Sequence, residues 1–488
     1  MEFDPTTQPE ETLDPENWEE LRVLGHRMVD DMLAYLENVR ERPVWQPIPE
    51  MVKTNLSLPL PRQPQGEQAA YEDFLNYVLP HPMGNAHPRF WGWVVGTGTP
   101  YSAMAEMLAA AMNPNVGGGD HAANYVEHQV IDWCKEMLGY PMDASGLLVS
   151  GGSMANLVGI TVARNTTAGF DIRKEGLQKC KDRLVCYGSV ETHSSVQKAV
   201  ELLGLGEDFL RQIPVNADYQ IDIPALDGAI AADREAGYRP FLVVGNAGTV
   251  NTGAIDDLNW LADICQRESM WFHVDGAFGA VAALAPDLQH LVAGMERADS
   301  LAFDLHKWMY MPFEAGCVLV KHEEGHRRAF SLTPDYLEHT ARGVGAGSVW
   351  FSDYGVQLSR GFRALKIWLS MKAHGIDKFS RLIQQNVHQA RHLAKLVHQT
   401  HNLENMAPVS LNIVCFRFNP GDLDEKTLNE LNKELLLQMH EGGVAVTSYT
   451  TLNGKYALRA CFINHRTRLE DIDLLIEEVL RLGDSLLS

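Results

Sequence analysis

Two stretches of the chain decide its fold: residues 271–280 read WFHVDGAFGA, and residues 299–311 read DSLAFDLHKWMYM. The apolar runs 270–274 and 300–303 predict two buried strands, since short apolar runs are typical of the interior of a parallel sheet. Asp275 follows the first strand and Lys307 comes shortly after the second. Parallel strand ends open onto one crevice, so the two side chains can meet although about thirty residues separate them.

The chemistry of these two side chains suits pyridoxal 5′-phosphate (PLP). A lysine amine condenses with an aldehyde to form a Schiff base. An aspartate can pair with a pyridinium nitrogen and keep it protonated, which makes the ring an electron sink. Taken singly, Asp275 is better explained as a helix cap and Lys307 as a surface lysine. A lysine between His306 and Trp308, just after an apolar strand, is a poor match for a solvated face.

The sequence HVDGAFGA followed by DLHKW resembles the group II PLP-dependent amino-acid decarboxylases, which include the aromatic-L-amino-acid, histidine and glutamate decarboxylases. The resemblance extends over residues 87–460 and is closest to the aromatic branch. It implies PLP as cofactor and α-decarboxylation of an L-amino acid to the amine and CO2. It also implies a fold-type I (aspartate-aminotransferase-like) large domain.

From residue 146 to 320, short apolar runs alternate with helical stretches. This alternation predicts an α/β fold with a mostly parallel sheet covered by helices. The expected strands are 147–149, 184–187, 241–244, 271–274, 300–303 and 316–320, and a long helical segment is expected near 354–400. Strands at 408–418 and 455–463 with flanking helices predict a small α+β domain. We expect three parts: an arm at 1–95, the PLP-binding domain at 96–370 and the small domain at 371–488.

The N-terminal arm contains a helical pattern from residue 18 and a proline-rich segment at 42–65. A segment of this composition forms no core of its own and must lie along another surface. In the resembling family this region wraps the partner subunit, so the resemblance implies a homodimer.

Composition narrows the possible partners and the compartment. The net charge of −22 disfavours nucleic acid and anionic membranes as partners. The seven cysteines contain no CxxC pair, which favours free thiols in a reducing compartment over disulfides or zinc. The acidic N-terminus has no signal-peptide pattern, and no apolar run is long enough to span a bilayer. We therefore expect a cytoplasmic enzyme.

Residues 150–156, SGGSMAN, join a strand to a helix. Glycines allow close approach to a phosphate, and free N–H groups at a helix N-terminus bind anions. On its own this stretch is better explained as a strand–helix turn with a serine cap. Beside Asp275 and Lys307, and with the family resemblance, it predicts Gly152 and Ser153 as phosphate contacts.

The resemblance assigns further cofactor contacts. His193 would stack on the cofactor ring and position the substrate carboxylate, and Ala277 would pack on the opposite ring face. Thr249 would lie near the cofactor, and His306 would contact phosphate or substrate. Asp304 stands where animal aromatic decarboxylases carry asparagine, and a carboxylate facing phosphate is repulsive unless it accepts strong hydrogen bonds.

An aromatic substrate is expected from Trp91 and Trp93, which follow the HP-x-F segment that lines the side-chain pocket in the family. Core packing explains these tryptophans equally well. The glycines at 117–119 replace bulkier residues of the aromatic decarboxylases. Tryptophan, tyrosine, phenylalanine and dihydroxyphenylalanine remain open as substrates, as do glutamate, histidine and diaminobutyrate. An aldehyde synthase of the same fold is a further alternative.

Residues 332–347 form a polar, glycine-containing segment expected to be a mobile loop over the crevice. Tyr336 within it resembles the tyrosine of the decarboxylases' flexible loop, which completes the neighbouring subunit's site. A phenol in that place can return a proton to Cα after CO2 leaves. The related aldehyde synthases carry phenylalanine there, so Tyr336 favours amine formation.

A competing motif is His322-Glu323-Glu324-Gly325-His326, which matches the H-E-x-x-H pattern of zinc hydrolases. A zinc helix needs an apolar back face, and polar residues flank this motif on both sides. We therefore expect a solvated turn leaving the sheet, and no metal site.

Overall fold

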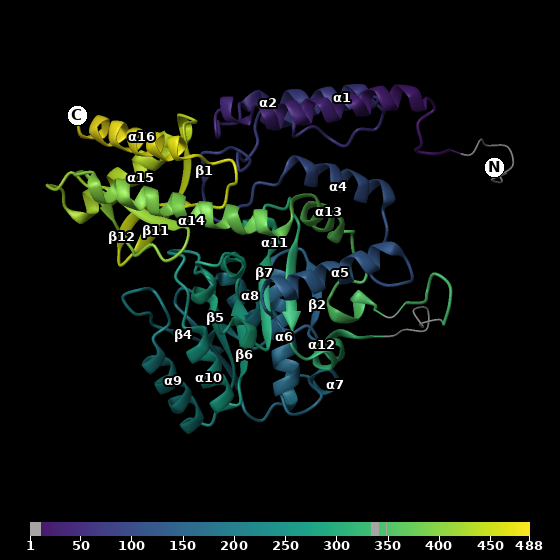
Figure 1. Ribbon diagram of the computed structural model, residues 1–488, viewed down its shortest axis with the longest axis vertical. Coiled ribbons are helices and arrows are strands. Elements are labelled where there is room, and N and C mark those ends of the chain that lie inside the picture. The colour runs from purple at the N-terminus through teal and green to yellow at the C-terminus, as the bar shows by residue number, and fades with distance from the viewer. Residues whose placement is uncertain (1–10, 333–340, 348) are drawn as a thin grey trace.

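The computed structural model describes residues 11–332, 341–347 and 349–488. Within these ranges the chain forms two sheets (Figure 1). A seven-stranded sheet lies between residues 145 and 320, and a five-stranded sheet combines residues 90–91 with the C-terminal part of the chain.

The seven-stranded sheet has the strand order β2-β8-β7-β6-β5-β3-β4. Strands β7, β6, β5, β3 and β4 run parallel, while β8 is antiparallel to both β2 and β7. The mostly parallel sheet is as predicted, but β4 has no counterpart among the predicted strands. The bounds are β2 Ser145–Val149, β3 Leu184–Ser189, β4 Leu210–Ile213, β5 Arg239–Asn246, β6 Trp271–Asp275, β7 Ser300–Asp304 and β8 Gly316–Val320.

Helices α6 and α10 cover opposite faces of this sheet, as the alternation of side chains on β6 requires. His273 and Asp275 point to one face, where both bond to Asn156 of α6. The ring of Phe272 points to the other face, where it meets α10 beside Gly245. The helices of this part are α4 Pro100–Met112, α5 Ala122–Met137, α6 Gly152–Thr167, α7 Ile172–Glu175, α8 Ser194–Leu202, α9 Ile223–Glu235, α10 Leu258–Glu268, α11 Leu305–Trp308, α12 Glu323–Phe330 and α13 Ala364–His374.

The five-stranded sheet has the order β1-β11-β12-β10-β9. Strand β1 comes from the segment predicted to belong to the N-terminal arm, and it pairs in parallel with β11. The neighbouring helices pack on this sheet and close a second apolar core. The bounds are β1 Phe90–Trp91, β9 Leu403–Asn405, β10 Ile413–Phe418, β11 Val446–Leu452, β12 Lys455–Cys461, α14 Ile376–Gln399, α15 Glu425–Glu441 and α16 Leu469–Leu487.

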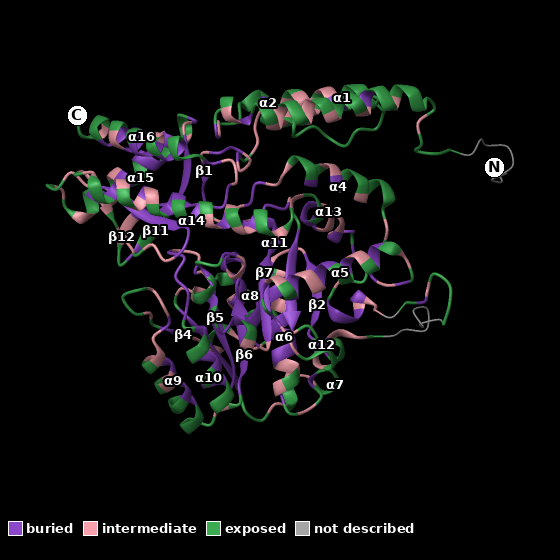
Figure 2. Ribbon diagram, viewed as in Figure 1, coloured by how far each residue is buried: buried purple, intermediate pink, exposed green. Residues whose placement is uncertain are grey.

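The N-terminal arm contains α1 Trp18–Glu37, α2 Glu50–Asn55 and α3 Glu67–Asp73. Helix α1 begins where Asn17 accepts hydrogen bonds from the amides of Glu19 and Glu20. Of its twenty residues only Leu24 is buried, and Figure 2 shows α1 as exposed and intermediate surface along the edge of the molecule. Helix α2 lies within the proline-rich segment 42–65.

Two further predictions about elements were wrong. Residues 322–326 do not form a solvated turn, because residues 323–330 form α12 and His326 is fully buried. The long helical segment near 354–400 is two helices, α13 and α14, since Gly375 adopts φ +68° and ends the first of them. Among the helices described, none combines the length and apolar character that a membrane span requires.

Candidate active site

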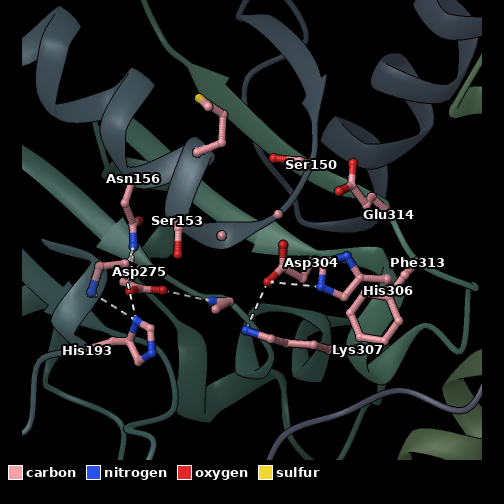
Figure 3. Close-up of a pocket in the computed structure, with 15 residues that line it drawn as sticks. Ser150, Ser153, Asn156, His193, Asp275, Asp304, His306, Lys307, Phe313 and Glu314 are labelled. Carbon is pink, nitrogen blue, oxygen red and sulfur yellow. Dashed lines mark hydrogen bonds and ion pairs between the residues drawn. The ribbon is translucent and has the colours of Figure 1, made fainter. Parts of the chain in front are cut away.

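A pocket of about 380 Å³ opens where β6 and β7 end, beside the N-termini of α6 and α8. Figure 3 shows its side chains converging from these elements. The carboxyl ends of parallel strands create such a crevice, so the sheet itself determines where the pocket lies. The lining residues are Ser150, Gly151, Gly152, Ser153, Met154, Asn156, His193, Ser195, Asp275, Ala277, Asp304, His306, Lys307, Phe313 and Glu314.

Most of the predicted site residues meet in this one pocket. They are Gly152, Ser153, His193, Asp275, Ala277, Asp304, His306 and Lys307. Thr249, Trp91 and Trp93 do not line it. Tyr336 lies outside the described residues.

Asp275 is held in place from two directions. Its Oδ2 accepts a hydrogen bond of 2.8 Å from Asn156 Nδ2, and its Oδ1 accepts one of 3.1 Å from the amide of Ala277. The residue is only 5% exposed. A carboxylate fixed in this way can pair with a protonated ring nitrogen placed in the pocket.

His193 is the N-cap residue of α8. Its Nδ1 accepts a hydrogen bond of 3.2 Å from the amide of Ser195 and lies 2.8 Å from Ser195 Oγ. Burial lowers the pKa of His193, although the charge of Asp275 opposes the shift. The ring is therefore neutral at pH 7. A neutral imidazole can stack against the ring of a cofactor.

Lys307 follows β7 in the short helix α11, and its Nζ lies 2.9 Å from Asp304 Oδ2. Burial acts to lower the pKa of Lys307, but the carboxylates of Asp304 and Asp275 outweigh it and the net pKa is raised. The amine is thus protonated at neutral pH. It must lose this proton before it can attack an aldehyde.

The turn between β2 and α6 forms an open cradle, because Gly151 and Gly152 place no side chains there. A Cβ at Gly152 would lie 2.9 Å from Asp304 Oδ2, and one at Gly151 would lie 3.1 Å from the ring of His306. Gly151, the N-cap of α6, has no side chain to accept from the first amides of the helix. These amides are therefore suited to binding an anion.

Asp304 and His306 complete this end of the pocket. Asp304 Oδ2 forms an ion pair with Lys307 Nζ at 2.9 Å, and among the described residues neither buried oxygen of Asp304 has a further hydrogen-bond partner. His306 Nδ1 accepts from the amide of Ala315, and burial lowers the pKa of His306. The neutral ring therefore carries its proton on Nε2, which faces Asp304 at 3.7 Å.

These residues match the chemical groups of PLP one by one. Lys307 supplies an amine for the aldehyde, Asp275 a carboxylate for the ring nitrogen, and the start of α6 an anion site for the phosphate. His193 and Ala277 line the pocket beside them. The donor set and the open cradle fit the cofactor.

The predicted substrate tryptophans lie elsewhere. Trp91 is 1% exposed, packs near Phe462 and donates a hydrogen bond of 3.2 Å to Thr467 Oγ1. The pairing of β1 with β11 places it in the core of the second sheet, so the prediction that it lines a substrate pocket was wrong. Trp93 is 53% exposed, and its backbone carbonyl accepts from Arg459.

Thr249 is buried within its own turn. Its Oγ1 accepts from the amide of Ala254 and lies 3.1 Å from Thr252 Oγ1. The hydroxyl therefore stabilises the turn after β5. The glycines at 117–119 are also explained by packing, since Trp350 occupies the space that a side chain at Gly118 would need.

The H-E-x-x-H motif is not arranged to bind zinc. His326 Nδ1 lies 2.8 Å from Ser145 Oγ, and its Nε2 lies 2.8 Å from the carbonyl oxygen of Tyr354. Both ring nitrogens are used within the protein, so neither is free to coordinate a metal. Within the described ranges, three or more potential metal ligands nowhere gather into a cluster.

Sequence reasoning assigned no role to several lining residues, above all Asn156 and Ser195. Asn156 lies one helical turn after Gly152, a spacing that puts both on one face of α6. That spacing was the sequence feature that could have placed Asn156 at the site. Its partner Asp275 is 119 residues away, and no local pattern connects the two.

Comparison with known proteins places the fold and the pocket in a family. The family model of the pyridoxal-dependent decarboxylase conserved domain matches residues 49–419. An aromatic-L-amino-acid decarboxylase from Bacillus atrophaeus is 35% identical over 471 residues, which are 96% of each chain. A phenylacetaldehyde synthase from Petunia hybrida is 30% identical over 92% of this chain and 90% of the relative. The crystal structure of Oryza sativa TDC with PLP and tryptamine superposes with a TM-score of 0.90 at 26% identity, covering 98% of this chain and 100% of that chain.

The chain belongs to the pyridoxal-dependent decarboxylase family. It has the fold-type I architecture, and PLP is its cofactor. The protein is a PLP-dependent amino-acid decarboxylase.

Proposed function

We propose that the protein converts an aromatic L-amino acid to the corresponding amine and CO2. The observation that carries this proposal is the 35% identity to the Bacillus aromatic-L-amino-acid decarboxylase along nearly the whole of both chains. The rice structure solved with PLP and tryptamine supports the same substrate class. Tryptophan, tyrosine, phenylalanine and dihydroxyphenylalanine are the candidates.

In the proposed mechanism PLP supplies the electron sink that accepts the electrons of the broken Cα–carboxylate bond. Lys307 would hold the cofactor through its side-chain amine. Asp275 pairs with the ring nitrogen, and Gly152, Ser153 and His306 hold the phosphate. The presence of all these residues in one pocket supports this division of roles.

His193 and Ala277 would hold the cofactor ring between them. A ring held in this way would let the pocket orient the Cα–carboxylate bond of the substrate for cleavage, and orientation of this kind is a large part of catalysis. The neutral His193 also presents Nε2–H as a hydrogen-bond donor for the departing carboxylate. Trp93, which is half exposed, remains a candidate for contact with the aromatic side chain.

Tyr336 is the proposed proton donor to Cα after CO2 has left. A phenol can donate this proton when its hydroxyl lies within hydrogen-bond reach of Cα. The second candidate function is aldehyde synthesis, which the similarity to the Petunia phenylacetaldehyde synthase favours. The tyrosine at position 336 supports amine formation over that alternative.

We further propose that the enzyme works as a homodimer in the cytoplasm. Exposed apolar side chains along α1 and α4, among them Trp18, Val23, Met107 and Met112, support a surface that a second copy covers. The seven cysteines are all free, which suits a reducing compartment.

The test is a panel of the twenty amino acids with purified enzyme and PLP, followed for CO2, amine, aldehyde and peroxide. We expect amine and CO2 from at least one aromatic amino acid. Turnover of glutamate or diaminobutyrate with none of any aromatic substrate would overturn the proposal.

The Lys307→Ala variant tests the covalent attachment. We expect PLP that is no longer fixed to the protein by borohydride, together with a loss of activity of several orders of magnitude, because the variant has no amine at this position. A peptide map of the wild-type enzyme should carry the reduced cofactor at Lys307. Fixation at a different lysine would contradict the assignment.

A further inference from the structure

A continuous line of buried hydrogen bonds runs behind the cofactor pocket. Trp271 Nε1 donates to Ser300 Oγ at 2.8 Å, and Ser300 Oγ lies 2.7 Å from His273 Nδ1. His273 Nε2 lies 2.9 Å from Asn156 Oδ1. All four side chains are less than 5% exposed, so water does not compete for these bonds.

At Asn156 the line divides into two branches. Asn156 Nδ2 donates to Asp275 Oδ2 at 2.8 Å and to Ser195 Oγ at 2.9 Å. Ser195 Oγ in turn lies 2.8 Å from His193 Nδ1. One side-chain amide therefore contacts Asp275 directly and reaches His193 through a single hydroxyl (Figure 3).

The direction of each bond follows from its chemistry. The carboxylate of Asp275 only accepts, so the amide nitrogen of Asn156 faces it and the amide oxygen faces His273. His273 must then carry its proton on Nε2. Burial lowers the pKa of His273 to about 4, so the ring is neutral and its bare Nδ1 accepts from Ser300. Trp271, which can only donate, completes the line by donating to Ser300.

The same reasoning determines the proton on His193. Ser195 Oγ accepts from Asn156, so its own hydrogen points to His193 Nδ1. The backbone amide of Ser195 donates to the same nitrogen at 3.2 Å. His193 Nδ1 therefore receives two hydrogen bonds and carries no proton, which leaves the proton on Nε2.

We propose that Asn156 is a positioning residue that joins Asp275 and His193 into one unit, which holds the Asp275 carboxylate where it would pair with the cofactor's ring nitrogen and keeps the His193 proton on Nε2. His273, with Ser300 behind it, fixes the rotation of the Asn156 amide. The inference rests on the roles proposed above for Asp275 and His193, and it adds the residue that couples them.

The backbone is shaped for this arrangement. A Cβ at Gly159, two turns after Gly152 in α6, would lie 2.8 Å from His273 Cε1 and 3.2 Å from Ser300 Oγ. Glycine inside a helix costs stability relative to alanine. Here it lets α6 approach β6 and β7 closely enough for Asn156 to reach both partners. The phosphate cradle and the linking amide thus lie on one rigid helix.

The test uses ring-nitrogen NMR of enzyme labelled with ¹⁵N-histidine, with the His193 signals assigned from a His193→Gln variant. In the wild type, with and without PLP, we expect a bare Nδ1 and a protonated Nε2 on His193. In Asn156→Asp the new carboxylate accepts from Ser195, so its hydroxyl no longer donates to His193. We expect the Nδ1 signal to move further from that of a protonated nitrogen, because only the backbone amide of Ser195 still donates to this nitrogen.

The same variant should bind PLP about 10- to 100-fold more weakly, because the Asp275 carboxylate loses a buried hydrogen bond. Thr161→Val, a buried substitution in the same helix, is the matched control and should change neither measurement. Weaker PLP binding with unchanged His193 signals would overturn the coupling. Unchanged values of both quantities in a folded variant would overturn the whole inference.

Ser195→Ala provides a second route if Asn156→Asp fails to fold. It removes only the bridge to His193 and leaves the bond from Asn156 to Asp275. We expect altered His193 ring signals with less than a tenfold loss of PLP affinity, and unaltered signals would overturn the inference. The signals of the PLP-free protein do not depend on any substrate. An inactive enzyme that shows the expected signals would therefore refute the proposed function alone.

Discussion

At the scale of single residues, the carboxylate of Asp304 is the least expected feature of the site. It lies 2.9 Å from the amine of Lys307, at the end of the pocket where the cradle of α6 suits a phosphate. Its charge holds the proton on Lys307, as the raised pKa of that amine shows. Asp304 therefore opposes the first covalent step of cofactor binding while it stabilises the PLP-free site.

Replacing Asp304 by asparagine tests this account. Covalent uptake of PLP by the PLP-free enzyme should accelerate as the pH rises, because only the neutral amine of Lys307 reacts. In Asp304→Asn the pKa of Lys307 falls, and the pH curve of uptake should move down by about one to three units. The rate can be followed by absorbance of the bound cofactor.

A matched control is Asp227→Asn, which removes a carboxylate paired with Arg267 at the surface. This variant should keep the wild-type pH curve. If Asp304→Asn and the wild type take up PLP with the same pH dependence, Asp304 does not hold the proton on Lys307.

A second prediction at this scale concerns Tyr336. Tyr336→Phe should keep PLP binding and CO2 release, but it should shift the product from amine toward aldehyde with uptake of oxygen. Without the phenol, Cα remains unprotonated for longer after CO2 has left. Dissolved oxygen then has more time to react at this carbon. Oxygen electrode traces together with amine and aldehyde assays measure the shift. Amine formation at the wild-type rate without peroxide would show that another group donates the proton.

At the scale of elements, a buried ion pair fastens α5 to the strand that leads into the cradle. Glu127 of α5 pairs with Arg360, and Arg360 also donates to the carbonyl oxygens of Val116 and of Leu148 in β2. Both charged side chains are 1% exposed or less. A buried charge without its partner is costly, so each side chain requires the other.

The Glu127→Ala variant should therefore lower the free energy of unfolding by about 3–5 kcal/mol, the cost of leaving a buried charge unpaired. Urea unfolding followed by fluorescence measures this difference. Glu470→Ala is the control, because it removes contacts with Arg468 and Arg40 in which the Glu470 side chain is 66% exposed. Such surface pairs contribute about 0–1 kcal/mol. Equal effects of the two substitutions would show that the buried pair contributes no more than an exposed one.

At the scale of the whole molecule, helix α1 of the N-terminal arm is mostly unburied, since Leu24 is the one buried residue among its twenty. Helix α1 lies along the outside of the structure with Trp18 at 61% and Val23 at 63% exposure (Figure 2). Large apolar side chains gathered on one helix mark a surface for association. This is the physical ground for the proposed homodimer.

The Trp18→Lys variant should weaken the dimer by about 2 kcal/mol or more, since buried tryptophans are frequent hot spots of interfaces. Light scattering across a dilution series measures the change as a monomer fraction that rises at low concentration. Trp260→Lys on α10, where the tryptophan is 53% exposed, is the matched control and should remain dimeric. The same dissociation in both variants, or in neither, would place the interface elsewhere.

The sequence by itself determined the alternation of strands and helices and the positions of Asp275 and Lys307 at strand ends. These features depend on contacts between near neighbours and on the period of apolar residues, which are readable along the chain. The glycine turn before α6 belongs to the same class. Their meeting in one pocket followed from the single rule that parallel strands open at their carboxyl ends.

The tertiary structure alone decided the features that join distant segments. The pairing of β1 with β11 put Trp91 into the second core, and the packing of α12 buried His326 between Ser145 and Tyr354. Asn156 reached Asp275 only because α6 packs across β6. In each case, burial and the need to satisfy buried polar groups determine which residues contact one another. Both depend on the whole fold rather than on local sequence.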